Sequence, residues 1–179
     1  MKIHSEILPG VFVLAPAVFG DLRGNFVKTY HKPEFSQLGI DYEVAEEFYS
    51  TSAKNVIRGM HFQTPPHDAV KLIYCIHGSV LDVLVDLRQS SPTFGQFRSI
   101  ELSHKNSLIV MIPSGFGHGF LALENDTVMV YKASFVYAPD HDTGIRWDSF
   151  GFDWGVKDPI VSARDRALPS FAGWRSPFA

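Results

Sequence analysis

The sequence predicts an all-β fold, a sandwich or barrel of short strands, in one domain that spans residues 1–179. The strongest observation is the segment Val80–Arg88, in which the odd positions Leu81 to Leu87 are apolar and the even ones include two aspartates. Such a period of two is typical of a strand with two unlike faces. Other short apolar segments are separated by Gly, Pro and Asp clusters, and no repeat, linker or low-complexity tract divides the chain.

The expected strands are bounded by turn residues. In chain order they are Gly10–Leu14, Gly24–Tyr30, Glu43–Thr51, Val70–Ile76, Val80–Arg88, Ser99–Glu101, Ser107–Ile112, Gly119–Ala122 and Thr127–Val136. We expect one short helix over Lys32–Leu38, because Pro33 suits the first turn of a helix. After Asp158 the sequence predicts turns and short helical pieces. The apolar segment Ile7–Val18 is expected to add an edge strand, and edge strands pair readily between chains, which predicts a homodimer.

The composition narrows the classes of partner. Apolar residues make up 45% of the chain, charged residues 20%, and the net charge at pH 7 is −3. This is typical of a globular protein and gives no electrostatic reason to bind nucleic acid. No apolar run approaches a membrane span, and the first residues lack the apolar core of a signal peptide. The single cysteine, Cys75, is expected to be a buried thiol. Together these features predict a cytoplasmic protein without a membrane partner.

Three basic or ionisable residues form the first candidate site. Arg58 and His61 lie three residues apart, and Lys71 follows on the next expected strand. In a small barrel, alternate side chains point into the interior. Because unpaired charges are costly there, three such side chains converging on one cavity favour a bound anion. On the residues alone, a structural role for His61 is as well supported as a functional one.

The second candidate is the glycine-rich run Pro113–Phe120, which contains His118. Its spacing Pro-x-Gly-x-x-His is similar to the second motif of cupins, in whose metal-binding members this histidine is a ligand. The first cupin motif, His-x-His followed by Glu, is absent around His61. Three histidines, His61, His67 and His118, leave a zinc site open as a minority alternative.

Two tyrosines form a third candidate. Tyr131 and Tyr137 are six residues apart, so they share one face if the strand Thr127–Val136 is regular. Taken alone, this pattern is also typical of core or interface tyrosines.

Taken together, these segments resemble the dTDP-4-dehydrorhamnose 3,5-epimerase family. The resemblance runs from Gly10 to about Pro169, in the family's order and with closely similar spacing. The matching stretches are Asp21–Gly24, Arg58–Gln63, Lys71-Leu72, Gly78–Arg88, Ser91–Gly95, Ile112–Phe120, Tyr131-Lys132, Ile145–Asp148 and Ser162–Asp165.

This resemblance implies a cupin-like jelly roll with short peripheral helices. It also implies an epimerase that acts on a nucleoside-diphosphate 4-keto-6-deoxyhexose, in deoxysugar biosynthesis, with no cofactor and no metal. By the resemblance, His61 is the general base, Asp165 its partner, Tyr131 the general acid, and Lys71 lies beside the sugar carbonyl. The implied substrate-binding residues are Arg23, Phe26, Lys28, Glu46, Phe48, Arg58, His118, Tyr137, Asp142 and Arg164. Tyr137 would stack on the base, and Arg23 and Phe26 would act in the partner's site.

Two departures leave the nucleobase open. Lys28 stands where the family has Glu, and Glu46-Glu47-Phe48 replace Gln-Asp-Asn. This is either a simple exchange of charge or a different base, since a glutamate accepts from the amine of cytosine, which thymine lacks. An epimerase of C3 or C5 alone, acting on a CDP- or GDP-linked sugar, is therefore one alternative. A non-catalytic sugar-binding cupin is another, although a binding module needs no base and acid across one carbon.

Overall fold

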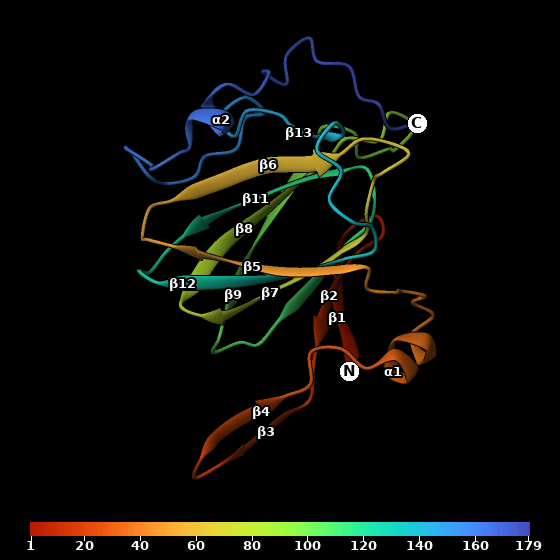
Figure 1. The fold of residues 1–179 in the computed structure, drawn as a ribbon, viewed down its shortest axis with the longest axis vertical. Coiled ribbons are helices and arrows are strands. Elements are labelled where there is room, and N and C mark those ends of the chain that lie inside the picture. The colour runs from red at the N-terminus through yellow and green to blue at the C-terminus, as the bar shows by residue number, and fades with distance from the viewer.

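The computed structural model describes residues 1–179 as two antiparallel sheets that face each other, with a separate hairpin projecting below them (Figure 1). The larger sheet has the order β1 (Lys2–Leu8), β2 (Val11–Ala15), β10 (Ile109–Ile112), β7 (Lys71–His77), β12 (Thr127–Ala133) and β5 (Glu46–Ser52). The smaller has the order β13 (Asp142–Gly144), β6 (Ile57–Gln63), β11 (Phe116–Ala122), β8 (Ser79–Asp86) and β9 (Phe97–Ser103). These sheets confirm the all-β prediction.

The two helices are short and peripheral, α1 (Lys32–Gln37) and α2 (Ala163–Arg166). Helix α1 begins where Pro33 predicts it, and it buries Phe35 against the larger sheet. Neither helix is long and apolar enough to cross a membrane.

Strand β8 shows how the core is divided. The even positions Val80 and Leu84 lie in a cluster that both sheets share, together with Ile73 of β7. The odd positions Val83 and Val85 lie in a second cluster, which is completed by aromatic residues of the C-terminal segment: Phe150, Trp154 and Phe178. The alternation was predicted correctly, but both faces are buried, because residues 145–178 cover the outer face of the smaller sheet. The two unlike faces of the predicted strand therefore contact two different cores, one between the sheets and one under the C-terminal segment.

Several strand boundaries differ from the sequence prediction. The segment Ile7–Val18 is wrong as a single edge strand: it turns at Gly10, with a φ of 86°, and β1 forms the edge of the sheet. The predicted strand Gly24–Tyr30 is half of a hairpin, β3 (Val18–Asp21) and β4 (Gly24–Val27). The prediction missed β6 as a strand, because its centre combines glycine with polar residues.

The β3–β4 hairpin, called the arm below, projects away from both sheets (Figure 1). Its apolar side chains are unusually exposed: Phe19 and Phe26 keep 63% and 62% of their surface, and Leu22 at the tip is fully exposed. Exposed apolar groups concentrated on one projecting element indicate a surface that binds another molecule.

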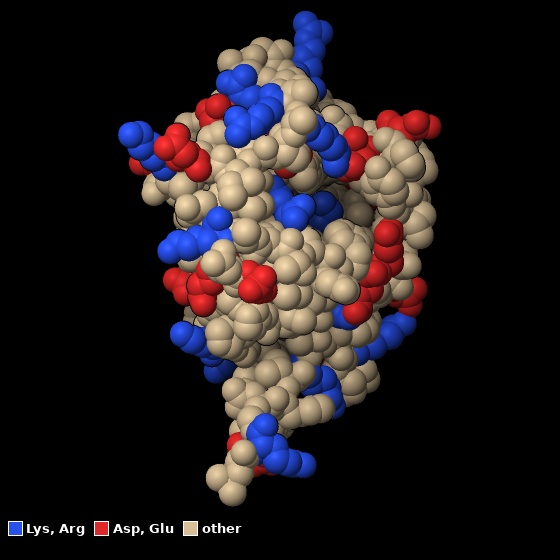
Figure 2. All heavy atoms as spheres, turned by 60° about the vertical axis from the view of Figure 1, so that its left-hand side comes forward, with Lys and Arg blue, Asp and Glu red and all other residues tan.

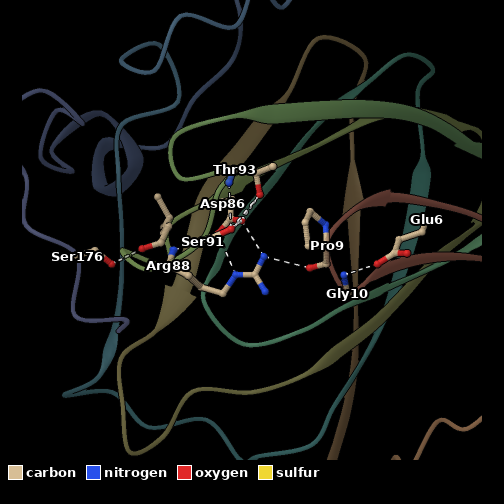
Figure 3. Close-up of polar contacts among 9 residues, drawn as sticks. Glu6, Pro9, Gly10, Asp86, Arg88, Ser91, Thr93 and Ser176 are labelled. Carbon is tan, nitrogen blue, oxygen red and sulfur yellow. Dashed lines mark hydrogen bonds and ion pairs between the residues drawn. The ribbon is translucent and has the colours of Figure 1, made fainter.

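A buried carboxylate ties the end of β8 to the β1–β2 turn (Figure 3). Asp86 accepts hydrogen bonds from the Arg88 side chain (2.7 and 2.9 Å), from Ser91 Oγ (2.6 Å) and from Thr93 Oγ1 (2.6 Å). The Arg88 guanidinium also donates to the carbonyl of Pro9, 3.0 Å away. Burial would raise the pKa of Asp86, but these donors outweigh it and hold the pKa at about 2. The motif Asp-x-Arg-x-x-Ser-x-Thr therefore has a structural role.

We expect Asp86→Asn to lower the free energy of unfolding by about 3 kcal/mol, because Arg88 then loses its charged partner at a buried site. Guanidinium unfolding at pH 7 measures the change. The matched control is Asp21→Asn, which removes an equally direct pair with Arg23 at the exposed tip of the arm. Exposed pairs contribute little, so the control should unfold like the wild type. Equal stability of the two variants would contradict the assignment of Asp86.

Candidate active site

A cavity of about 270 Å³ opens between the two sheets. A neighbouring cavity of about 220 Å³ shares Phe48, Lys71, Tyr137 and Asp142 with it, so the two form one continuous groove. Figure 2 shows a hollow in the upper half of the molecule with basic side chains inside it. The first cavity is lined by residues of both sheets: Phe48, Ser50, Arg58, His61, Lys71, His118, Tyr131, Tyr137, Asp142 and Arg164.

His61 and Asp165 form a hydrogen-bonded pair at the wall made by β6. The distance from His61 Nε2 to Asp165 Oδ1 is 2.7 Å, and the backbone N–H of Gly59 donates to Oδ2 at 3.2 Å. Asp165 is 3% exposed and lies in the first turn of α2, where Ser162 Oγ accepts its backbone N–H. Serine at this position is a common helix N-cap, which explains why the run Ser162–Asp165 brings the carboxylate to β6.

The Asp165 carboxyl is ionised despite its burial. Burial would raise its pKa, but the hydrogen bond and charge of His61, together with the Gly59 and Ser162 contacts, outweigh it and hold the pKa below its usual value. An ionised carboxylate can only accept hydrogen bonds, so His61 Nε2 must carry the proton that it donates. In the neutral ring, Nδ1 is then the basic nitrogen.

A second pair lies directly beside the first. His118 on β11 is the register partner of His61 on β6, and its Nε2 lies 2.7 Å from Asp82 Oδ1. Asp82 is completely buried, its Oδ2 has no partner, and burial raises its pKa above the usual value despite the contact with His118. This pair fixes the orientation of the His118 ring at the cavity floor.

Tyr131 lies on β12, in the sheet opposite His61. Its ring stacks on Phe48, with centroids 4.8 Å apart and planes at 11°, and its hydroxyl lies 3.3 Å from Ser50 Oγ. Burial raises the pKa of the phenol well above its ordinary value, which outweighs the contact with Ser50. The hydroxyl is therefore protonated at neutral pH and faces the cavity as a proton donor.

The cations of the site differ in their surroundings. Lys71 lies between the two cavities, where burial lowers its pKa and the charge of Asp142 only partly restores it. Arg58 is held by Ser52 Oγ and by the carbonyl of Thr51, each 3.0 Å away. Arg164 on α2 pairs with Asp142 on β13 at 2.6 Å, at the cavity rim. Three cations around one hollow can bind a polyanion.

The predicted residues divide into two groups. Glu46 and Phe48 on β5, Arg58 on β6, His118 on β11, Asp142 on β13 and Arg164 on α2 all line the groove, with His61, Lys71 and Tyr131. Arg23, Phe26 and Lys28 lie on or next to the arm, outside both cavities of their own chain. The groove therefore lacks them unless a second chain supplies them.

The predicted position of Tyr137 on a strand was wrong. Tyr137 was expected to share a face of one strand with Tyr131, but β12 ends at Ala133 and Tyr137 lies in the loop that follows. Both side chains nevertheless line the first cavity, because the loop folds back over it.

The three histidines of the zinc alternative do not meet. No three His, Cys, Asp or Glu side chains are grouped so that they could hold a metal ion. His67 instead packs against His141, with ring centroids 4.2 Å apart, and against Phe135.

Sequence reasoning missed three polar residues that hold the site together: Ser50 at the Tyr131 hydroxyl, Asp82 at His118, and Gln63 in the second cavity. Asp82 was noticed only as one of the polar positions of the alternating strand. Its even position next to Leu81 and Val83 was the available signal, since even positions of β8 face the interior.

The lowered pKa of Asp165 predicts that the free energy of unfolding depends on pH. Its folded-state pKa lies below that of the unfolded chain, which is about 3.9. The carboxylate therefore stabilises the fold above that value, and the contribution is lost as the pH falls through the lower, folded-state pKa. We expect Asp165→Asn to be less stable than the wild type in urea at pH 6, and the difference to shrink by pH 2.5. A difference that does not change with pH would contradict an ionised Asp165.

Comparison with known proteins gives a consistent result. Residues 5–173 match the family model described as dTDP-4-dehydrorhamnose 3,5-epimerase. The enzyme of that name from Salmonella typhimurium is 40% identical over 173 residues, which cover 94% of each chain. A crystal structure of the Bacillus anthracis enzyme superimposes with a TM-score of 0.92 at 39% identity, covering 95% of this chain and 99% of that one.

A second solved structure is a 3'-monoepimerase from Streptomyces bikiniensis in complex with dTDP-quinovose. It gives a TM-score of 0.90 at 30% identity and covers 95% of this chain and 88% of that one. These structures confirm the cupin-like jelly roll. With 40% identity across nearly the full length of both chains, this protein belongs to the dTDP-4-dehydrorhamnose 3,5-epimerase family of isomerases.

Proposed function

We propose that this epimerase inverts C3, C5 or both of a nucleoside-diphosphate 4-keto-6-deoxyhexose, with His61 as base and Tyr131 as acid. The observation that carries the proposal is their placement: His61 on the smaller sheet, hydrogen-bonded to Asp165 of α2, and Tyr131 on the larger sheet line the same cavity. A base and an acid on opposite sides of one sugar carbon are what inversion requires.

The chemistry follows from the substrate. In a 4-keto sugar the protons on C3 and C5 are acidic, because each lies next to the carbonyl. His61 Nδ1 takes one of them, the C–H electron pair becomes the C3=C4 or C4=C5 bond, and the carbonyl oxygen becomes an enolate. Lys71 stabilises this charge, and Asp165 stabilises the imidazolium that forms. Tyr131 then donates its proton to the opposite face of the same carbon, and the ketone is restored. His61 releases the proton that it took to the solvent, and the Tyr131 phenolate takes one from the solvent, which returns both groups to their starting states.

The nucleobase fits the second cavity, because its aromatic lining of Phe48, Phe135 and Tyr137 suits a base. Arg58 and Arg164 line the adjoining first cavity, where they suit a diphosphate. The Bacillus anthracis relative holds TDP and pyrophosphate, and the Streptomyces bikiniensis relative holds dTDP-quinovose, which supports a nucleoside diphosphate here.

Two kinds of nucleobase remain candidates for the substrate: thymine, and a base with an exocyclic amine. One carboxylate oxygen of Glu46 already accepts the backbone N–H of Tyr137 at 2.5 Å, so only the other oxygen is free to accept from a base. A glutamine at this position could make the same backbone contact through its amide oxygen. The replacement of Gln by Glu therefore does not by itself require a different nucleobase.

The number of inverted centres defines the second candidate. The Streptomyces bikiniensis relative is a 3'-monoepimerase with the same fold, so inversion of C3 alone is the alternative to inversion of both carbons. Deuterium incorporation by the wild type separates the two alternatives. An enzyme that inverts both carbons exchanges the protons on C3 and C5, whereas one that inverts C3 alone exchanges only the C3 proton.

We further propose a cytoplasmic homodimer in which each arm completes the partner's groove. The support is the exposed apolar surface of Phe19, Leu22 and Phe26, and the fact that neither Arg23 nor Lys28 lines the groove of its own chain. A dimer would bury these side chains and bring two further cations to the diphosphate.

Variants of the base and the acid should have separable effects. We expect His61→Ala to abolish deuterium incorporation from D₂O, whereas Tyr131→Phe still exchanges substrate protons but forms about 10²- to 10⁴-fold less inverted sugar. Tyr131→Phe keeps the ring that stacks on Phe48, so folding should be unchanged. NMR of the sugar signals measures exchange and inversion together. Wild-type inversion by Tyr131→Phe would remove the acid assignment.

Mixing two inactive variants tests the shared site. If the arm acts in the partner's groove, a heterodimer of His61→Ala and Arg23→Ala contains one wild-type groove and one doubly altered groove. Random reassociation of equal amounts should therefore restore about a quarter of wild-type activity, since half of the dimers are mixed and half of their grooves are intact. Light scattering measures the dimer. A monomeric wild type, or no recovery in mixtures shown to contain heterodimers, would contradict the proposal.

A further inference from the structure

The loop between β12 and β13 carries Tyr137 over the groove. Residues 136–138 have left the sheet, and their one backbone–backbone hydrogen bond, from the His141 N–H to the Ala138 carbonyl, lies within the loop itself. The Tyr137 side chain keeps 59% of its surface exposed, so packing does not hold it in place. Something else must therefore fix this segment if its tyrosine is to stay over the cavity.

Two side chains, one from each sheet, bind the backbone of these three residues. Gln63, the last residue of β6, accepts the Ala138 N–H at 2.7 Å and donates to the Val136 carbonyl at 3.3 Å. Glu46, the first residue of β5, accepts the Tyr137 N–H at 2.5 Å. Three consecutive residues are thus anchored by one side chain from each sheet.

Gln63 also joins a second loop to the first. Its amide nitrogen donates to the carbonyl of His67 at 2.7 Å, in the segment that links β6 to β7. Both N–H groups of the amide and its oxygen are therefore engaged with backbone, and no donor remains for a substrate. This full engagement distinguishes Gln63 from the other polar residues of the groove.

We propose that Gln63 is a positioning residue that holds the Tyr137 loop in its binding conformation, with Glu46 as the anchor from the other sheet. The proposal rests on the proposed function, in which Tyr137 stacks on the nucleobase. It predicts that Gln63 affects substrate binding through Tyr137 and leaves the proton transfers at His61 and Tyr131 unchanged.

The test variant is Gln63→Glu, which keeps the oxygen that accepts from Ala138 but places a carboxylate oxygen against the carbonyls of Val136 and His67. We expect KM for the nucleotide sugar, and Kd for TDP, to rise about tenfold while kcat stays within about twofold, because the loop is released and the reacting groups are not. Hydrogen exchange of the peptide 134–141 should become faster.

The matched control is Gln89→Glu, since the Gln89 amide also donates to a backbone carbonyl, that of Ser176, at 2.7 Å. It makes the same chemical change away from the groove and should leave KM unchanged. Gln63→Ala provides a second variant if the glutamate destabilises the fold, and it should raise KM in the same direction. Glu46→Gln keeps an acceptor for the Tyr137 N–H and should bind TDP better than Glu46→Ala.

A double-mutant cycle separates positioning from direct contact. If Gln63 acts through Tyr137, then Gln63→Glu adds no further loss of TDP binding in a Tyr137→Ala background. Additive losses, a fall in kcat at unchanged KM, or unaltered exchange of residues 134–141 would each overturn the proposal. If Tyr137→Ala binds TDP as the wild type does, the stacking assignment itself fails. If Tyr137→Ala binds weakly and Gln63→Glu binds normally, only the positioning role fails.

Discussion

The close approach of β6 to its neighbours is the constraint on which the site depends. A Cβ on Gly59 would lie 2.5 Å from the Cα of Gly119 on β11, and a Cβ on Gly144 of β13 would collide with the carbonyl of Met60. Only glycine permits these contacts. The short separation sets His61 beside His118 and leaves the Gly59 N–H free to bind Asp165. The glycines of the runs around His61 and His118 therefore place the two histidine–aspartate pairs side by side.

The sequence predicted the fold class well and its local detail unevenly. The alternation of Val80–Arg88 identified β8, but not that its outer face lies under Phe150 and Trp154, which are more than sixty residues away along the chain. Strand β6 lacks a period of two that sequence can show, since glycine and arginine interrupt it. The pairing of β6 with β11 and β13, which makes it a strand, is a tertiary property.

Candidate site residues that belong to local sequence motifs were predictable. Those whose contacts depend on how strands and loops pack together were not. His61, Lys71, Tyr131 and Asp165 followed from resemblance, and the structure brings them to one cavity or, for Asp165, to its wall. The roles of Ser50 and Gln63 were not predictable from sequence. The role of Ser50 depends on the pairing of β5 with β12, and that of Gln63 depends on two loops that lie next to the end of β6. Tyr137 illustrates the limit: spacing placed it on a strand face, whereas a loop held by Gln63 brings it to the groove.

Two aspartates on the same face of β8 have different surroundings. Asp82 and Asp86 lie four residues apart, so both point into the space between the sheets, and both are fully buried. Asp86 is surrounded by donors and its pKa is held at about 2, which makes it a fixed charge that ties β8 to the β1–β2 turn. Asp82 has a single histidine partner, one unpaired oxygen and a raised pKa. The two carboxylates of this face therefore differ in what they hold: Asp86 ties the end of the strand to the β1–β2 turn through Arg88, and Asp82 orients the ring of His118 at the cavity.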